Sequence, residues 1–523
     1  MAYHSVQYFL LFLPAVWLVW AAAPKKWRPG VLLAASLYFY WRSSGFAVVW
    51  LLGLSALVWV LGLAIHRADG LFAAARGALD PPARKALKKQ AAALKKPLLV
   101  LGVAVLLGVM FRVKYIHFVL DPLSGWLAAN RPWWPQLTLS PLAQPLGISF
   151  FSLMAISYLV DVYRGTAQPA ARYWQVLSYL SFWPHVVEGP FDRWGAVSAP
   201  LLDPPGPDYR ALTFGAQRIV WGLFKKIVIA DRANMYVKAV FDDWTQYSGL
   251  PILLGVLLYT LQLYAEFSGC MDIALGSAQS FGVELAENFR QPFFARSVGE
   301  FWRRWHITLG AWLREYVFQP VIVSRPMVRF GKWCKMHLGA GAGRRLPVWA
   351  GLLLTWLLIG LWHGAGTIYL YYGLYYFALQ ALGDAAEPWL LRLLPRLPAW
   401  RQTRPWKLWQ TARTFVLVNF GMMMFRSHGM RSVFQMLRSL AVPYAGGLLI
   451  KLDARDAAVL AVGAALMLAV DLLHERGVHL REALARRPLP LRWAVYIGAV
   501  VVTMLLGAYG DNYDPAGFIY AQF

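Results

Sequence analysis

The amino-acid sequence is a succession of apolar runs of roughly bilayer-spanning length, separated by short basic connections. A transmembrane helix needs about 20 apolar residues, and Lys and Arg gather in the loops on the cytoplasmic side. Only 15% of the residues are charged, where a soluble domain carries about 25%. The sequence therefore predicts an all-α, polytopic integral membrane protein embedded in the lipid bilayer. The candidate spans lie near residues 5–23, 30–41, 46–65, 98–114, 145–161, 174–188, 213–230, 250–280, 348–382, 411–426, 455–473 and 493–509.

Several of these runs are shorter or longer than a simple span, so we expect about 11–13 transmembrane or re-entrant helices. The sequence contains no internal repeat and no low-complexity linker. It therefore predicts a single membrane domain over residues 1–523, with its motif-bearing core at about 145–382.

The charge pattern excludes nucleic acid as a partner and orients the chain. The net charge is +25, but the Lys and Arg residues lie in the connections between apolar runs, as in membrane proteins. Residues 66–97 hold eight Lys or Arg and two Asp, which predicts a cytoplasmic loop. Counting spans from this loop predicts that the N-terminus and the tail 510–523 both lie on the opposite side.

Residues 348–382 carry no Asp, Glu, Lys or Arg, although both flanking loops are basic. A straight helix over this segment would exceed about 50 Å, against ~30 Å of hydrocarbon. The segment must therefore be broken and make an even number of crossings. Gly360, Gly364 and Gly366 mark the break, and His363 lies within it.

His363 is the strongest candidate for chemistry, because ionisable side chains at membrane depth are costly and mark functional sites by default. Imidazole accepts and returns a proton near neutral pH, as a general base must. The flanking glycines let a substrate or a neighbouring backbone approach closely. The alternative is a histidine hydrogen-bonded between helices for packing alone.

A second constellation follows Glu300 and includes Arg303, Arg304 and His306. On a helix, Phe301, Trp305, Leu309 and Trp312 would share one apolar face while the arginines project elsewhere. One interpretation is an amphipathic helix at the membrane interface with snorkelling arginines. The other is a cytoplasmic anion site for a phosphate-bearing donor, since arginine binds phosphate through paired hydrogen bonds.

Carboxylates form a third group within apolar runs. Glu266 and Asp272 lie in the 250–280 run, where they are expensive unless paired. We expect them to be structural ion-pair partners of Arg290, Arg303 or Arg304, and the alternative is a role in acid–base catalysis. Glu188 follows a Pro-interrupted run and is a possible site residue, although a turn at the membrane surface explains it equally well.

Four ordered blocks give the chain a resemblance to the membrane-bound O-acyltransferases, and its length and its ending at residues 518–523 look most like their bacterial branch that includes alginate O-acetylation. The blocks are residues 182–193 (Phe-Trp-Pro-His through Glu-Gly-Pro), 266–276, 287–316 (Glu-Asn-Phe-Arg-Gln-Pro, then Glu-Phe-Trp-Arg-Arg-Trp-His) and 360–366 (Gly-Leu-Trp-His-Gly-Ala-Gly).

This resemblance implies helices around a central tunnel, through which an acyl group passes from a cytoplasmic thioester to a hydroxyl. It implies that His363 is catalytic and that His306 is a second functional position, which orients the donor or polarises its carbonyl. We place Arg303 and Arg304 at the donor site, where they could hold the donor's phosphates, together with Trp305 and Trp362. We expect no metal and no bound cofactor, since a thioester is already activated.

The resulting hypothesis is a bacterial inner-membrane O-acetyltransferase with periplasmic termini, which uses acetyl-CoA or an acyl carrier as donor. It would decorate a cell-surface polysaccharide such as alginate, with a periplasmic acetyltransferase as partner protein. The alternative is a transporter or flippase for lipid-linked glycan that uses His363 in a proton pathway, since broken helices also suit transporters.

Overall fold

A computed structural model describes residues 5–75, 80–131 and 145–509 of the chain. Within these ranges the regular structure is helical, and the only β-type pairing is an isolated antiparallel bridge between Phe289 and Trp305. The predicted all-α class is confirmed.

Six helical segments of the described chain are long and apolar enough to cross a membrane. This finding confirms a polytopic membrane protein. The other predicted spans fall on helices that are shorter or less apolar. The predicted sidedness of the termini stays a prediction, and the tail 510–523 lies outside the described residues. The six segments are Lys25–Gly70, Pro81–Lys114, Leu250–Gln279, Ala340–His363, Ala454–Glu475 and Leu489–Leu506.

The exposed faces of these helices explain why they need lipid. In α24 (Leu489–Leu506) the side chains of Val500, Val502 and Leu505 are 44%, 45% and 76% exposed. A helix that is apolar on all sides and not buried in protein is typical of a membrane span.

The chain divides into two compact units, Met1–Ala216 with Ala274–Ala286, and Gln217–Ile273 with Glu287–Phe523. We call them unit 1 and unit 2. The prediction of one membrane domain stays a prediction. The helices of unit 1 are α1 (Leu13–Ala22), α2 (Arg28–Ser44), α3 (Val48–Ala75), α4 (Pro81–Lys114), α5 (Ile116–Asn130), α6 (Ile148–Arg164), α7 (Tyr173–Ser181), α8 (Trp183–Val186) and α9 (Trp194–Leu202). Helix α10 (Tyr209–Leu223) begins in unit 1 and ends in unit 2, and α12 (Leu250–Gln279) begins in unit 2 and ends in unit 1.

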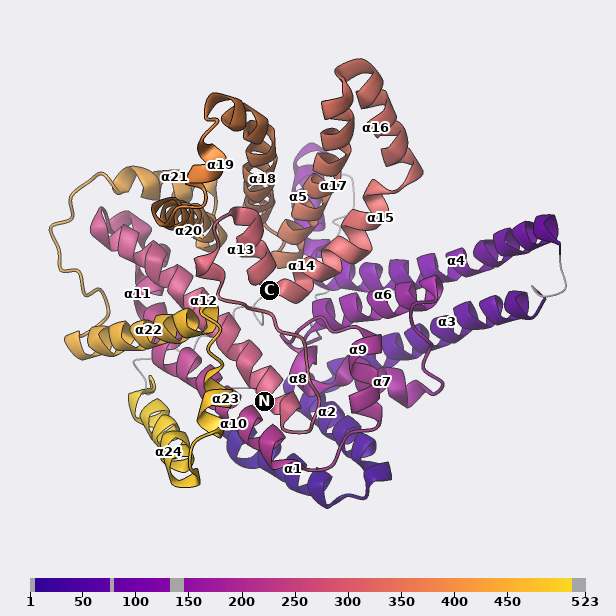
Figure 1. The fold of residues 1–523 in the computed structure, drawn as a ribbon, viewed down its shortest axis with the longest axis horizontal. Coiled ribbons are helices and arrows are strands. Elements are labelled where there is room, and N and C mark those ends of the chain that lie inside the picture. Colours follow the sequence, from indigo (N-terminus) through magenta and orange to yellow (C-terminus); the bar gives the residue numbers. More distant parts are fainter. Residues whose placement is uncertain (1–4, 76–79, 132–144, 510–523) are drawn as a thin grey trace. The chain divides into compact units, whose positions relative to one another are not determined.

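In unit 1, helices α3 and α4 run side by side (Figure 1), and α6 packs against both. Helix α6 is buried along most of its length, which fits its run of apolar and small side chains. It starts after Gly147, where φ is +68° and a Cβ atom would lie 1.8 Å from the Val186 carbonyl oxygen. Only glycine fits at this start, because other residues are strained in that conformation and the space is filled by backbone.

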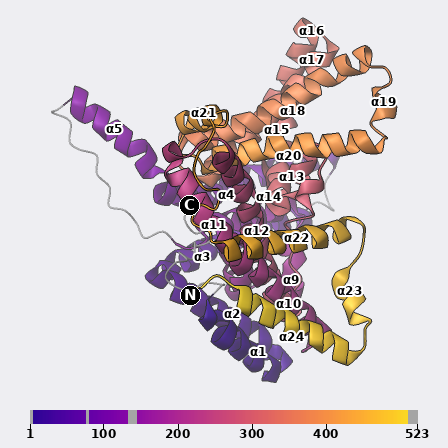
Figure 2. The same ribbon diagram turned by 90° about the vertical axis from the view of Figure 1, so that its left-hand side faces the viewer.

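Unit 2 contains the remaining helices. Helices α16 and α17 form a hairpin (Figure 1), and α18 is joined through α19 to α20, which lies beside it (Figure 2). The α-helices that lie wholly in unit 2 are α11 (Asp231–Asp242), α13 (Val298–Arg304), α14 (Ile307–Leu313), α15 (Gln319–Ile322), α16 (Arg325–Leu338), α17 (Ala340–His363), α18 (Thr367–Leu393), α19 (Leu397–Trp400), α20 (Arg404–Arg426), α21 (Met430–Ser439), α22 (Ala454–Glu475), α23 (Leu480–Ala485) and α24. A π-helical segment, η5 (Phe224–Ala230), lies between α10 and α11.

The break predicted within residues 348–382 is confirmed. Helix α17 ends at His363 and α18 begins at Thr367, so the turn contains Gly364 and Gly366. The two helices then pack against each other. A Cβ atom on Gly360 would lie 2.2 Å from the Tyr369 carbonyl oxygen, so this glycine lets the backbones of α17 and α18 approach closely.

Candidate active site

His363 is the last residue of α17 and is only 4% exposed. Its ring meets aromatic side chains edge-on from three helices. The ring of Phe425 on α20 lies 4.9 Å away at 90°, and that of Tyr372 on α18 lies 6.1 Å away at 84°. Trp362 on α17 lies at 4.9 Å and 75°. The break at the end of α17 therefore places the His363 imidazole among aromatic side chains that shield it from solvent.

His306 occupies a second break, between α13 and α14. The continuous helix expected to carry Phe301, Trp305, Leu309 and Trp312 on one face is wrong at this point, because His306 has a left-handed φ of 48°. The Ile307 N–H donates to the Asn288 carbonyl oxygen at 3.0 Å, and the Arg290 N–H donates to the Arg304 carbonyl oxygen at 2.9 Å. The extended segment 288–290 thus takes up backbone groups that a continuous helix would have paired internally.

The structure brings the two histidines together although they are far apart in the sequence. The ring of His306 lies 5.7 Å from that of Trp362, which is adjacent to His363. On its other side, His306 meets the edge-on ring of Phe267 at 4.8 Å. We call His306, Trp362, His363 and Phe425 the histidine cluster.

His306 lies outside the six candidate spans and is 3% exposed. Burial, and secondly the nearby His363, lower the pKa of His306 well below its usual value. Its imidazole is therefore neutral at physiological pH and can accept a proton rather than carry one.

The two predicted donor-site arginines have different environments. The guanidinium of Arg304 is bidentate to Glu475 at 2.6 and 3.1 Å and also pairs with Glu300 at 2.8 Å. Arg303 is exposed. Arg304 therefore links α13 to the end of α22, while Arg303 has the accessibility that a donor phosphate requires.

The two predicted donor-site tryptophans are both largely buried. Trp305 is 4% exposed and stacks on Phe301 at 5.5 Å, with Phe289 edge-on at 5.0 Å. Trp362 is 8% exposed, and its ring lies 5.7 Å from that of His306 and 4.9 Å from that of His363. Trp305 supports the break at His306 from within an aromatic core, whereas Trp362 belongs to the histidine cluster itself.

Glu266 is paired with a lysine, and the arginine partners expected from the sequence are wrong. The ammonium of Lys226, in η5, lies 2.9 Å from a Glu266 carboxylate oxygen and 2.8 Å from one of Asp231. Lys226 is 0% exposed and Glu266 is 1% exposed. The pairing compensates charges that would otherwise be very costly to bury.

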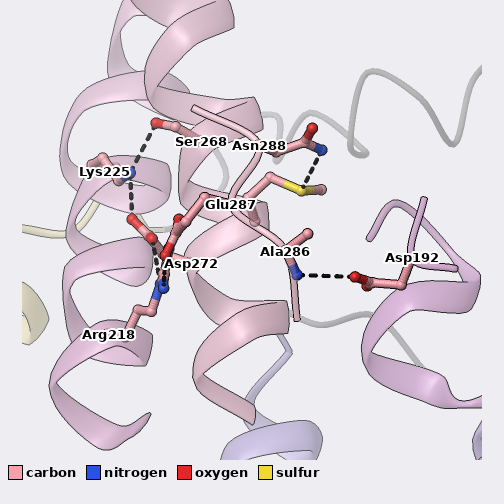
Figure 3. A network of polar contacts seen from close by, with 9 residues as sticks. Asp192, Arg218, Lys225, Ser268, Asp272, Ala286, Glu287 and Asn288 are labelled. Carbon is pink, nitrogen blue, oxygen red and sulfur yellow. Dashed lines mark hydrogen bonds and ion pairs between the residues drawn. The ribbon is translucent and has the colours of Figure 1, made fainter. Parts of the chain in front are cut away.

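Asp272 forms a second ion-pair group, shown in Figure 3. Its carboxylate accepts from Arg218 at 2.8 Å and from Lys225 at 2.6 Å, and Lys225 also donates to Ser268 at 2.8 Å. Arg218 pairs with Glu287 as well. Both cations come from α10 and η5, so these ion pairs join that helical stretch to α12.

Glu188 lies in unit 1, in the turn that follows α8. It is 2% exposed, and the neighbouring His185 is 0% exposed with Nε2 2.6 Å from the Tyr179 carbonyl oxygen. Both side chains are therefore buried in protein, and a role of Glu188 in the site stays a prediction.

Sequence reasoning missed three contributors to this site: Asn288, Phe425 and the lysine pair Lys225–Lys226. The lysines carried a usable signal, because they lie inside the predicted span 213–230 and would need buried carboxylates. Asn288 and Phe425 carried none, since a single Asn or Phe is not informative by itself. Among the described residues, no group of three or more His, Cys, Asp or Glu could hold a metal ion.

The described chain is thus a polytopic helical membrane protein in which two buried histidines share one aromatic cluster. A model of the membrane-bound O-acyltransferase (MBOAT) family matches residues 171–424, which include His306, Trp362 and His363 and end one residue before Phe425. The chain belongs to the membrane-bound O-acyltransferase family, and it is an acyltransferase.

Three of its relatives are named for acyl transfer that involves alginate, peptidoglycan or teichoic acid. The probable alginate O-acetylase AlgI of Azotobacter vinelandii is 31% identical over 448 residues, which cover 84% of this chain and 78% of that protein. The peptidoglycan O-acetyltransferase of Helicobacter pylori is 29% identical over 388 residues, covering 68% and 67%. The teichoic acid D-alanyltransferase of Bacillus subtilis is 27% identical over 246 residues, covering 47% and 60%. Membership of this enzyme family removes the basis for the transporter alternative.

Proposed function

We propose that this protein moves an acetyl group from a cytoplasmic thioester, acetyl-CoA or an acyl carrier, for O-acetylation of an exported polysaccharide such as alginate. The observation that carries the proposal is the histidine cluster, in which two buried imidazoles flank one tryptophan. Two of the relatives described above are named as O-acetylating enzymes of saccharide polymers, which supports acetyl as the group and a saccharide hydroxyl as its final destination.

In the proposed reaction, His363 accepts the proton of an acceptor hydroxyl as the hydroxyl oxygen attacks the thioester carbonyl carbon. The C–O bond forms, the C–S bond breaks, and the proton passes from His363 to the departing thiolate. No electrons are gained or lost, and no resident cofactor is required. A positioned base of this kind contributes about 10²–10⁴-fold.

The aromatic surround supports this role, because it keeps His363 in one orientation and excludes water. Exclusion of water protects the thioester from hydrolysis and strengthens the electrostatic interactions of the reacting groups. The glycine turn after His363 leaves α17 and α18 in close contact, which fixes the imidazole at the end of a rigid helix.

On the donor side, we propose that Arg303 holds the phosphates of the donor, because it is exposed and carries a fixed positive charge. Arg304, already paired with Glu300 and Glu475, would keep α13 in place. The setting would be the bacterial inner membrane, with a periplasmic acetyltransferase as partner protein that passes acetyl to the polymer.

The direct cellular test is complementation of a deletion strain, followed by mass analysis of the acetyl content of its surface polysaccharide. The His363→Gln variant should lose acetylation while its amount in the membrane stays at the wild-type level. The matched control is His428→Gln, because His428 is an exposed histidine of unit 2 outside the histidine cluster. Unchanged acetylation with His363→Gln would rule out the proposed role of this residue.

A further inference from the structure

Asn288 has a buried side chain at the break that carries His306, and it is 1% exposed. Its Oδ1 lies 3.0 Å from the Thr308 backbone nitrogen, 2.9 Å from the Thr308 hydroxyl and 3.3 Å from Nδ1 of His306. Its Nδ2 lies 3.1 Å from the sulfur of Met271 (Figure 3). One amide thus contacts both the backbone after His306 and the His306 ring.

The orientation of this amide is fixed by chemistry. The backbone N–H of Thr308 is always a donor, so the Asn288 atom that faces it must be the oxygen. The opposite orientation would point an NH₂ group at an N–H and take it away from the Met271 sulfur, a weak acceptor. The atom that faces His306 Nδ1 is therefore an acceptor without a proton.

The consequence concerns the imidazole of His306. A nitrogen that is hydrogen-bonded to an acceptor oxygen must be the donor, so the neutral His306 ring carries its proton on Nδ1. In a neutral imidazole only one nitrogen is protonated. Nε2 then holds the lone pair and can accept a proton or a hydrogen bond, but it cannot donate one.

We propose that Asn288 is a positioning residue that fixes the tautomer and the ring orientation of His306, so that Nε2 serves as a hydrogen-bond acceptor. This inference rests on the proposed function, which supplies the reaction in which that acceptor takes part. It excludes one of the two roles expected for His306, because a ring with no proton on Nε2 cannot polarise a thioester carbonyl through that atom. His306 instead accepts a hydrogen bond that orients a reacting group, while His363 remains the base.

A purely structural role for Asn288 makes different predictions. Thr308 is the second residue of α14, so Asn288 also satisfies a donor at the start of that helix. The Thr308→Val variant removes the hydroxyl contact but keeps the backbone N–H that orients the amide. Its His306 tautomer should therefore remain that of the wild type.

The first test is solid-state ¹⁵N NMR of histidine-labelled protein in bilayers, with the His306 signals assigned by their loss in His306→Gln. We expect a protonated Nδ1 and an unprotonated Nε2 in the wild-type protein and in Thr308→Val. Asn288→Leu should release the preference and give a mixture of tautomers. A wild-type ring protonated on Nε2, or an unchanged ring in Asn288→Leu, would overturn the proposal.

The second test is the pH dependence of acetyl transfer in Asn288→Asp. A carboxylate at this position keeps the acceptor and raises the pKa of His306, because it stabilises the imidazolium. If activity needs neutral His306, the variant should lose activity, as the pH falls, at a higher pH than the wild type does. The acid limb should move upward by about one pH unit or more, a tenfold loss at a fixed pH on that limb. An unmoved limb would contradict the proposal.

The matched control is Asn419→Asp. Asn419 is also a buried asparagine of unit 2 that accepts from a threonine hydroxyl, at 2.7 Å from Thr260. It should lose stability to a similar degree while the His306 signals and the acid limb stay in place. If the NMR result holds but His306→Gln retains full transfer, the proposed function of His306 fails and the positioning role stands. If transfer requires His306 but its tautomer does not depend on Asn288, the positioning role fails alone.

Discussion

Gly360 offers a sharp test of the link between the helix break and catalysis. It lies one turn before His363 on α17, against the backbone of α18. A Cβ atom there would lie 2.2 Å from the Tyr369 carbonyl oxygen. Ordinary contact between carbon and a carbonyl oxygen needs about 3.3 Å, so Gly360→Ala must push the two backbones apart by about 1 Å.

Two magnitudes follow from this displacement. Overpacking of a tight contact costs about 1–3 kcal/mol, which outweighs the gain of roughly 1 kcal/mol from placing Ala in a helix. A misplacement of about 1 Å at a catalytic group can cost 10²-fold in rate. We therefore expect Gly360→Ala to have a lower thermal midpoint and a kcat reduced by about two orders of magnitude.

The assay compares purified wild-type protein, Gly360→Ala and Gly341→Ala in the same detergent, by thermal unfolding and by thioester-dependent acetyl transfer. Gly341 is the matched control, because it lies on the same helix with no atom within 4 Å of its would-be Cβ. It should keep or slightly gain stability and retain its rate. If Gly360→Ala unfolds at a lower temperature but keeps its kcat, the helix contact does not position His363 and the reasoning is refuted.

Two further predictions concern the charged groups. Lys226→Met removes the buried cation shared by Glu266 and Asp231, so we expect a loss of about 3–5 kcal/mol in stability. A thermal midpoint equal to that of the wild type would contradict this pairing. Arg303→Ala should raise KM for the donor roughly tenfold and leave kcat nearly unchanged, because a charged hydrogen bond contributes about 1.5–3 kcal/mol. Steady-state kinetics measure the KM for the donor, with Arg431→Ala as the control because Arg431 is another exposed arginine. An equal KM in both variants would show that Arg303 is not part of the donor site.

The break near His363 could be predicted from the sequence because two signals mark it, the length of the charge-free segment and the glycines within it. A charge-free segment too long for the bilayer has to be interrupted, and glycine marks where. The structure ends α17 at His363 and starts α18 after the glycines, as expected. No contact with another part of the chain was needed for that inference.

The break at His306 could not be predicted in this way. Residues 300–313 have helical periodicity, and the four apolar residues of the expected face are all buried. The helix is nevertheless interrupted, because Asn288 and the backbone beside it take the hydrogen bonds that would have continued it. Such a contact is tertiary and overrides local propensity.

The wrong partners of Glu266 have a similar origin. The sequence shows that a buried carboxylate needs a cation, but it does not show which cation lies within reach. The arginines near His306 were the nearest in chain order among the recognised blocks. The structure instead uses Lys226, which lies within η5 on a helical stretch that packs beside α12.

The proposed role of His363 as the base for acetyl transfer to a hydroxyl can be measured in a purified system. Proteoliposomes with the protein receive labelled acetyl thioester, and the assay follows both the thiol released and the label incorporated into an acceptor hydroxyl. We predict that wild-type protein yields the two in equal amounts and that His363→Gln lowers both by about 10²–10⁴-fold with its fold intact. Transfer at the wild-type rate by folded His363→Gln protein would contradict the assignment.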